Sequence, residues 1–184
     1  MIVQPDTEEV VGATRAWLER AVIGLNLCPF AKSVYLHDRI RYFVSGARSP
    51  ASLLDELMAE LRTLHAADPG QCETTLLIHP HVLGDFSDYN EFLGQADDAI
   101  AELGLEGVIQ VASFHPRYQF EGAGPDDIEN YTNRSPHPML HLLRESSVER
   151  AVTTHPDTTA IYRKNMDTLR ALGHDGWRRL WLAE

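Results

Sequence analysis

The chain has 184 residues, of which 43% are hydrophobic and 23% are charged, and this predicts a single globular domain over residues 1–184. Its 16 Lys and Arg against 27 Asp and Glu give a net charge of −11, which repels phosphate backbones and disfavours a nucleic-acid partner. The acidic start, the absence of a long apolar run and the two cysteines predict no secretory signal, no membrane span and no disulfide framework. We therefore expect a cytoplasmic protein.

Strand and helix patterns alternate along most of the chain. Asp6 has the spacing of a helix cap, and the first helix is expected to end before Pro29. Alternating or continuous apolar runs predict strands over residues 39–45, 74–79 and 107–114. Amphipathic helices are expected between them, starting at Ser49 and at Asp85 or Ser87. Further helices are expected over residues 139–143 and from Ser146 onward, with Asp157 as the cap of the last one.

This order predicts an α/β protein with a small, mostly parallel sheet covered by helices and a helical C-terminal third. Two crossover helices between three strands favour parallel pairing with right-handed connections. An α+β ferredoxin-like sheet is the alternative, because the order of strands within a sheet cannot be read from one sequence.

Two of the predicted strands end in the same pattern, an apolar residue followed by His-Pro. If these strands are parallel, His79 and His115 emerge on the same edge of the sheet, where open sheets bind their ligands. The two imidazoles are candidate catalytic bases or ligands for a divalent metal such as zinc. Alternatively, each ring hydrogen-bonds a nearby carbonyl, and the sequence contains no HxH, HExxH or CxxC metal pattern.

Cys28 is a third candidate catalytic residue. If Pro29 begins a new helical turn, the helix dipole stabilises a thiolate at Cys28. If Cys28 only follows the first helix, the nearby carbonyls disfavour the thiolate. The alternative is a small buried apolar residue, which is the commoner environment of a free cysteine.

The long polar stretch over residues 115–137 contains the candidate ligand-binding side chains. Loops of this length are uncommon in compact domains unless they are functional or disordered. An arginine fork with neighbouring amide groups can hold a carboxylate or phosphate, whereas the alternative is pairing of the arginine with Asp126 or Asp127. The candidates in this stretch are Tyr118, Gln119, Asn133 and Arg134.

Three further candidates follow the loop. If residues 139–143 extend as a helix, His141 and Glu145 share one face of it and Arg144 borders that face. The three side chains would then form part of a ligand-binding site. The alternative is an exposed helix flank.

Four motifs carry a resemblance to a known family: LNLCPF at 25–30, QVASFHP with YQF at 110–120, TNRSP at 132–136 and LHLLRE at 140–145. With these motifs the chain resembles the bacterial family DUF1415, a domain of unknown function, over nearly its whole length. The resemblance implies a soluble bacterial protein whose motifs lie near one another, and it implies no mechanism. Where an aromatic residue is expected after Ser135-Pro136, this chain has His137, which we leave out of the candidate site.

Together these residues predict an enzyme that acts on a small polar or anionic metabolite, with metal-assisted hydrolysis as its reaction. In this hypothesis His79, His115 and Cys28 are catalytic, and Asn133 and Arg134 hold the anion. The alternative is a non-catalytic module that binds a small anion or a protein partner. A thiol redox protein is disfavoured because Cys28 and Cys72 form no CxxC motif.

Overall fold

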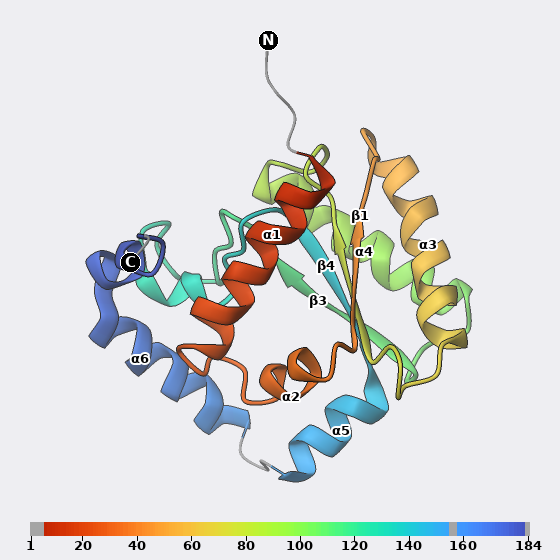
Figure 1. The fold of residues 1–184 in the computed structure, drawn as a ribbon. Helices are drawn as coiled ribbons and strands as arrows, with labels where there is room; N and C mark the ends of the chain where they lie inside the picture. The colour runs from red at the N-terminus through yellow and green to blue at the C-terminus, as the bar shows by residue number, and fades with distance from the viewer. Residues whose placement is uncertain (1–5, 155–157, 183–184) are drawn as a thin grey trace.

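A computed structural model of the chain describes residues 6–154 and 158–182, in which a β-sheet lies between two groups of helices (Figure 1). The strands are β1 (Ile40–Val44), β2 (Thr74–Ile78), β3 (Ile109–Phe114) and β4 (Met139–Arg144). The helices are α1 (Thr7–Trp17), α2 (Ala31–Leu36), α3 (Pro50–Ala66), α4 (Phe86–Glu102), α5 (Glu145–Thr154) and α6 (Thr158–Arg179), with a π-helical segment η1 (Leu18–Ile23) and a 3-10 helix η2 (Ile128–Thr132). The predicted α/β class and helical C-terminal third are confirmed.

Within the described residues the sheet has four strands in the order β1-β2-β4-β3. β1 and β2 pair in parallel, whereas β4 runs antiparallel to both β2 and β3. The sheet is therefore mixed rather than mostly parallel. Helix α3 connects the neighbouring parallel strands β1 and β2 in an ordinary β-α-β crossover. Helix α4 connects β2 and β3 in a split β-α-β crossover, in which β4 lies between the two strands.

The prediction of a short helix over residues 139–143 is wrong, because this segment forms β4. Met139 lies opposite Ile78 on one side and opposite Phe114 on the other, so the strand is paired along both edges. Its Leu140 and Leu142 point together into the core. β4 also separates β2 from β3, which run in the same direction but are not neighbours.

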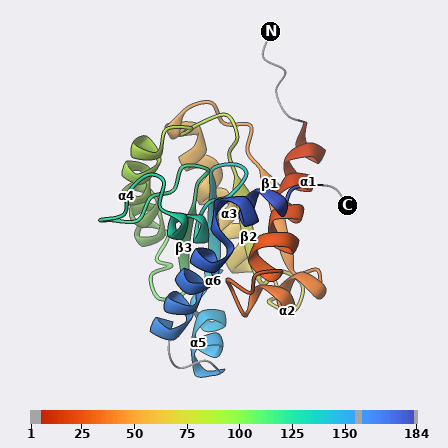
Figure 2. The same ribbon diagram turned by 90° about the vertical axis from the view of Figure 1, so that its left-hand side faces the viewer.

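One face of the sheet is covered by α3 and α4, on the side opposite to α1 (Figure 2). The predicted caps of both helices are confirmed. The Ser49 hydroxyl accepts a hydrogen bond from the Ser52 amide, and the Asp85 carboxylate accepts one from the Ser87 amide. The two helices bury these side chains against the sheet: Leu53, Leu57, Leu61, Leu64, Tyr89, Phe92, Ala96 and Ile100.

The opposite face is covered by α1, η1, α2 and α6. The tail folds onto this face, and Trp177 is buried in its cluster. Gly173, with a φ of 65°, kinks the last helix, and α6 continues to Arg179. Asp6 precedes α1 without a side-chain capping bond, and Asp157 lies outside the described residues.

The helices of residues 6–154 and 158–182 include none with both the length and the apolar character needed to cross a membrane.

Candidate functional site

The two histidines at the strand ends both hydrogen-bond the loop that contains Val82 and Leu83. His79 and His115 are both fully buried. Nδ1 of His79 lies 3.0 Å from the carbonyl oxygen of Val82, and Nε2 of His115 lies 3.2 Å from that of Leu83. Because a carbonyl only accepts, these ring nitrogens carry the protons. Nδ1 of His115 then accepts a hydrogen bond from the amide of Arg117 at 3.0 Å.

Tyr89 lies between the two imidazoles. Its ring centroid is 5.8 Å from that of His79 and 5.1 Å from that of His115. Its hydroxyl donates to the carbonyl of Met139 at 2.8 Å and accepts from the amide of Phe114 at 3.0 Å. The hydroxyl therefore bridges the end of the β3–β4 ladder, and its burial raises the pKa of Tyr89.

This environment keeps both imidazoles neutral. Burial lowers the pKa of His79 to about 4 and also lowers the pKa of His115. Nε2 of His79 is enclosed without a hydrogen-bond partner among the described residues, whereas both nitrogens of His115 are engaged. Nowhere in residues 6–154 and 158–182 does a group of three His, Cys, Asp or Glu side chains suit a metal ion. Nδ1 of His79 and both nitrogens of His115 bond the backbone, so we do not build the proposed function on the expected metal site.

Cys28 does not join the histidines. Its half-buried side chain packs against the cluster on the α1 face, which includes Trp17 and Met139. The ring of His115 instead contacts Phe86 and Tyr89 on the α4 face. The expectation of one catalytic site formed by Cys28 and the two histidines is wrong, because the sheet separates them.

Asn133 and its neighbours tie down the loop over residues 115–137. The Asn133 side chain donates to the carbonyl of Ser113 at 3.1 Å, and its own carbonyl accepts from the His115 amide. Gln119 donates from Nε2 to the carbonyl of Ala123 at 2.5 Å. The ring of Tyr118 packs on Phe86. These candidates therefore order the loop that carries them.

The three candidates after the loop lie in a strand and at a helix start, not on one helix face. Nε2 of His141 lies 2.7 Å from the hydroxyl of Thr74, and burial lowers the pKa of His141 to about 4. Glu145 begins α5, and its amide donates to the carbonyl of Val108. Nη2 of the buried Arg144 lies within 3.2 Å of the carbonyl oxygens of Leu64, Ala67 and Cys72. Arg144 thus bonds carbonyls at the end of α3 and in the segment that follows it.

A cavity of about 410 Å³ opens on the other side of the loop, between α1 and the end of α6. All three tryptophans of the chain line it. We call it the tryptophan cavity and define it by Trp17, Tyr131, Arg134, Pro136, Trp177 and Trp181.

Three of the aromatic rings of this cavity, those of Tyr131, Trp177 and Trp181, contact one another edge-on. The centroid of Trp177 is 4.9 Å from that of Tyr131 and 5.7 Å from that of Trp181. These are the separations that aromatic pairs prefer. The cavity therefore has walls of fixed rings, although Trp181 at its rim remains 38% exposed.

Arg134 is the charged side chain of the cavity. Its guanidinium carbon lies 4.6 Å from the centroid of the Tyr131 ring. Nε donates to the carbonyl of Tyr118 at 3.1 Å, and Nη2 donates to that of Pro125 at 2.6 Å. Within the described residues Arg134 binds these carbonyls rather than Asp126 or Asp127, and Nη1 has no hydrogen-bond partner there. The cation is thus held in place without being neutralised.

The sequence predicted Arg134 as a site residue but did not reveal the aromatic walls. Trp17 and Trp177 come from opposite ends of the chain, and no local pattern brings them together. The one available signal was that the chain has only three tryptophans and that two of them lie close together near its C-terminal end.

The fold and the cavity define a mixed α/β protein with one sheet and an aromatic pocket on the face of the sheet that α1 covers. A family model described as "Protein of unknown function (DUF1415)" matches residues 9–179. The chain belongs to this family. No curated protein and no solved structure matches it.

Proposed function

We propose that this protein is a binding protein whose ligand is a small planar aromatic carboxylate held in the tryptophan cavity. The observation that carries the proposal is that all three tryptophans line one cavity together with a fixed arginine. Tryptophan, tyrosine and arginine are the residues that contribute most to binding energy at recognition sites.

Size and chemistry both favour such a ligand. A volume of about 410 Å³ lies within the range of small-molecule pockets, which are mostly apolar with a few fixed polar groups. Indole and phenol rings provide edges and faces for a planar ring, and Nη1 of Arg134 provides a donor for a carboxylate oxygen. A ligand with one negative charge also suits a chain of net charge −11, which repels polyanions.

The proposal follows the binding alternative rather than the enzyme hypothesis. The enzyme hypothesis made His79 and His115 the base or ligands and added Cys28 as an optional third participant. Both imidazoles now bond the loop at Val82 and Leu83, and the sheet separates Cys28 from them. Arg134 is the candidate that keeps its proposed role, because it lines an open cavity.

We further propose that the protein works in the cytoplasm. The support is that Cys28 and Cys72 are both free thiols, as expected in a reducing compartment.

The test uses the three tryptophan indole N–H signals in a two-dimensional NMR spectrum. Titration with 2-naphthoate should shift all three, because each tryptophan lines the cavity. Its uncharged analogue 2-naphthamide should bind about tenfold more weakly, the effect of one charge-assisted hydrogen bond. This comparison tests the contribution of charge without altering the protein.

Two variants test whether Arg134 is the positive charge that binds the carboxylate. Arg134→Gln should bind 2-naphthoate as weakly as the amide, whereas Arg163→Gln, an exposed arginine of α6 outside the cavity, should bind like wild type. Unchanged indole signals at millimolar 2-naphthoate would contradict the site. Equal affinity for carboxylate and amide would remove Arg134 from it.

A further inference from the structure

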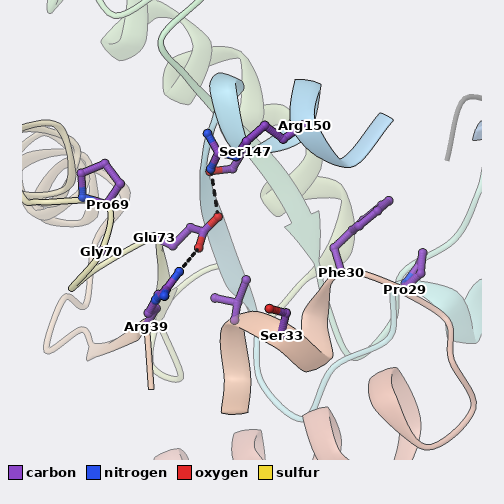
Figure 3. Close-up of a pocket in the computed structure, with 10 residues that line it drawn as sticks. Pro29, Phe30, Ser33, Arg39, Pro69, Gly70, Glu73, Ser147 and Arg150 are labelled. Atoms are coloured by element: carbon purple, nitrogen blue, oxygen red, sulfur yellow. Dashed lines mark hydrogen bonds and ion pairs between the residues drawn. The ribbon is translucent and has the colours of Figure 1, made fainter. Parts of the chain in front are cut away.

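Figure 3 shows a second cavity, of about 680 Å³. Its lining residues Arg39 and Glu73 precede β1 and β2, whereas His79 and His115 follow the other ends of β2 and β3. It forms where β1 and β2 begin and where β4 leads into α5. It shares no lining residue with the tryptophan cavity. We call it the arginine cavity and define it by Phe30, Ser33, Arg39, Glu73, Ser147 and Arg150.

The sheet itself brings the charged residues together. Ile40 and Thr74 are paired across the parallel strands β1 and β2, so the residues before them, Arg39 and Glu73, are neighbours. The amide of Glu73 donates to the carbonyl of Arg39 at 2.9 Å. β4 ends beside the start of β2, and α5 therefore carries Arg150 to the same edge.

Two guanidinium groups share one carboxylate there. Figure 3 shows Glu73 between Arg39 and Arg150. The contacts are long, at 3.5 Å from Arg39 and 3.3 Å from Arg150, and each uses a single nitrogen. By contrast, Arg41 binds Glu60 through two nitrogens at 2.7 and 3.0 Å.

Both arginine side chains line the cavity and are more exposed than the carboxylate between them. The Glu73 side chain is 16% exposed, whereas Arg39 is 36% and Arg150 is 63% exposed. Loose ion pairs near the surface contribute little to stability, so a ligand can displace them at low cost. The charged residues that line the cavity are two arginines and one glutamate.

Two serine hydroxyls add neutral donors. Ser147 accepts a hydrogen bond from Nη2 of Arg150 at 2.9 Å, which leaves its own proton available. Ser33 lies on the α2 wall. Two arginine forks and two hydroxyls around one space match a tetrahedral oxyanion with several acceptor oxygens better than a planar carboxylate.

We propose that the arginine cavity binds a phosphate group, and that Glu73 competes with it for the two arginines. The site is independent of the tryptophan cavity and would stand if the function proposed there failed. Inorganic phosphate and the phosphate of a small metabolite offer the same chemistry, and the experiment separates them.

Isothermal titration of the full chain at low ionic strength, with inorganic phosphate and with glycerol 3-phosphate, tests the proposal. Arg39→Gln should weaken binding about tenfold, because it removes charge-assisted donors. Glu73→Gln should strengthen binding, because it removes the competing carboxylate while keeping the side-chain shape. Arg62→Gln, an exposed arginine of α3 outside the cavity, is the matched control and should bind like wild type.

Misfolding cannot explain the increase in phosphate affinity that we expect for Glu73→Gln, because an unfolded variant does not bind more tightly. Tighter binding of glycerol 3-phosphate than of inorganic phosphate would identify a metabolite, and the reverse would identify the free ion. Absence of phosphate binding to both wild type and Glu73→Gln would overturn the proposal. So would equal affinities of wild type, Arg39→Gln and Glu73→Gln.

Discussion

The strand-end histidines and the tryptophan cavity show two different uses of polar groups among aromatic rings. Around Tyr89, the ring nitrogens and the hydroxyl are buried, and nearly all of them bond the backbone. In the tryptophan cavity, Arg134 is also fixed by two backbone carbonyls, yet it lines open space. We conclude that a polar motif marks a binding site only where some of its hydrogen-bonding groups remain available to a ligand.

One loop serves both regions. His115 and Asn133 join the two ends of residues 115–137 by a hydrogen bond from the His115 amide to the Asn133 carbonyl. The buried Asn130 accepts from the amide of Phe120 and donates to the carbonyl of Gly124. A long loop without regular strands is held rigid in this way, and rigidity is what lets Arg134 keep one orientation.

The largest expected effect on stability lies at the histidine side of this comparison. Tyr89→Phe removes only a hydroxyl, but it leaves the carbonyl of Met139 and the amide of Phe114 without their partner. Each unpaired buried group costs about 1–3 kcal/mol, so we expect the loss of both bonds to lower the free energy of unfolding by about 2–6 kcal/mol. Urea-induced unfolding measures this difference.

The comparison predicts that the same variant retains ligand binding. Folded Tyr89→Phe should bind 2-naphthoate with wild-type affinity, because Tyr89 belongs to α4 on one face of the sheet and the tryptophan cavity lies on the α1 side. A loss of stability below about 1 kcal/mol would show that the hydroxyl is not structural.

The second expected effect is a loss of stability in acid. The pKa values of His79 and His141 are lowered from 6.5 to about 4 by burial. Below pH 6.5 the two histidines therefore bind protons in the unfolded chain but stay neutral in the folded chain until the pH approaches 4. The contribution of the two neutral histidines to the free energy of unfolding is complete above pH 6.5 and is lost as the pH falls toward 4. Between pH 7 and pH 5 the loss is about 2 kcal/mol per histidine.

Urea unfolding at pH 7 and pH 5 checks this effect. In His79→Asn a side-chain amide replaces the Nδ1 donor to Val82 and does not titrate. In His141→Gln an amide replaces the Nε2 donor to Thr74. Both variants should lose less stability than wild type on acidification, and an unchanged loss in both would assign the acid sensitivity to other groups.

Local patterns predicted most of the fold. β1, β2 and β3 appeared as short apolar or alternating runs, and α3 and α4 began at the caps that the sequence indicated. β4 was missed because residues 139–144 fit both periods: Met139, Leu142 and Leu143 have helical spacing, whereas Leu140 and Leu142 alternate. Insertion of β4 between β2 and β3 is a long-range pairing, and it made the sheet mixed.

The candidate site was predicted less well, for a related reason. His79 and His115 reached the same edge of the sheet, as their strand directions required, but the loop at Val82 and Leu83 folds back over them. That loop depends on Leu83, which has a positive φ of 55° unusual for a leucine and has no sequence signal. The tryptophan cavity depends on contacts between the two ends of the chain, which short motifs do not encode.

The smallest expected effect on stability lies at the rim of the cavity. Trp181 is 38% exposed and packs edge-on against Trp177, so Trp181→Ala should lower the free energy of unfolding by only about 0.5–1 kcal/mol. Its effect on ligand affinity should be much larger, about tenfold or more, because a tryptophan that closes over a bound ring contributes strongly to recognition.

The matched control for this prediction is Tyr162→Ala, which removes an exposed aromatic side chain that lies on α6 and outside the cavity. Urea unfolding and the 2-naphthoate titration are carried out on both variants. We expect similar small losses of stability in the two, but weakened binding in Trp181→Ala alone. Equal binding by both variants would mean that Trp181 only covers the surface. A large loss of stability in Trp181→Ala would instead place it with Tyr89 among the residues that hold the fold together.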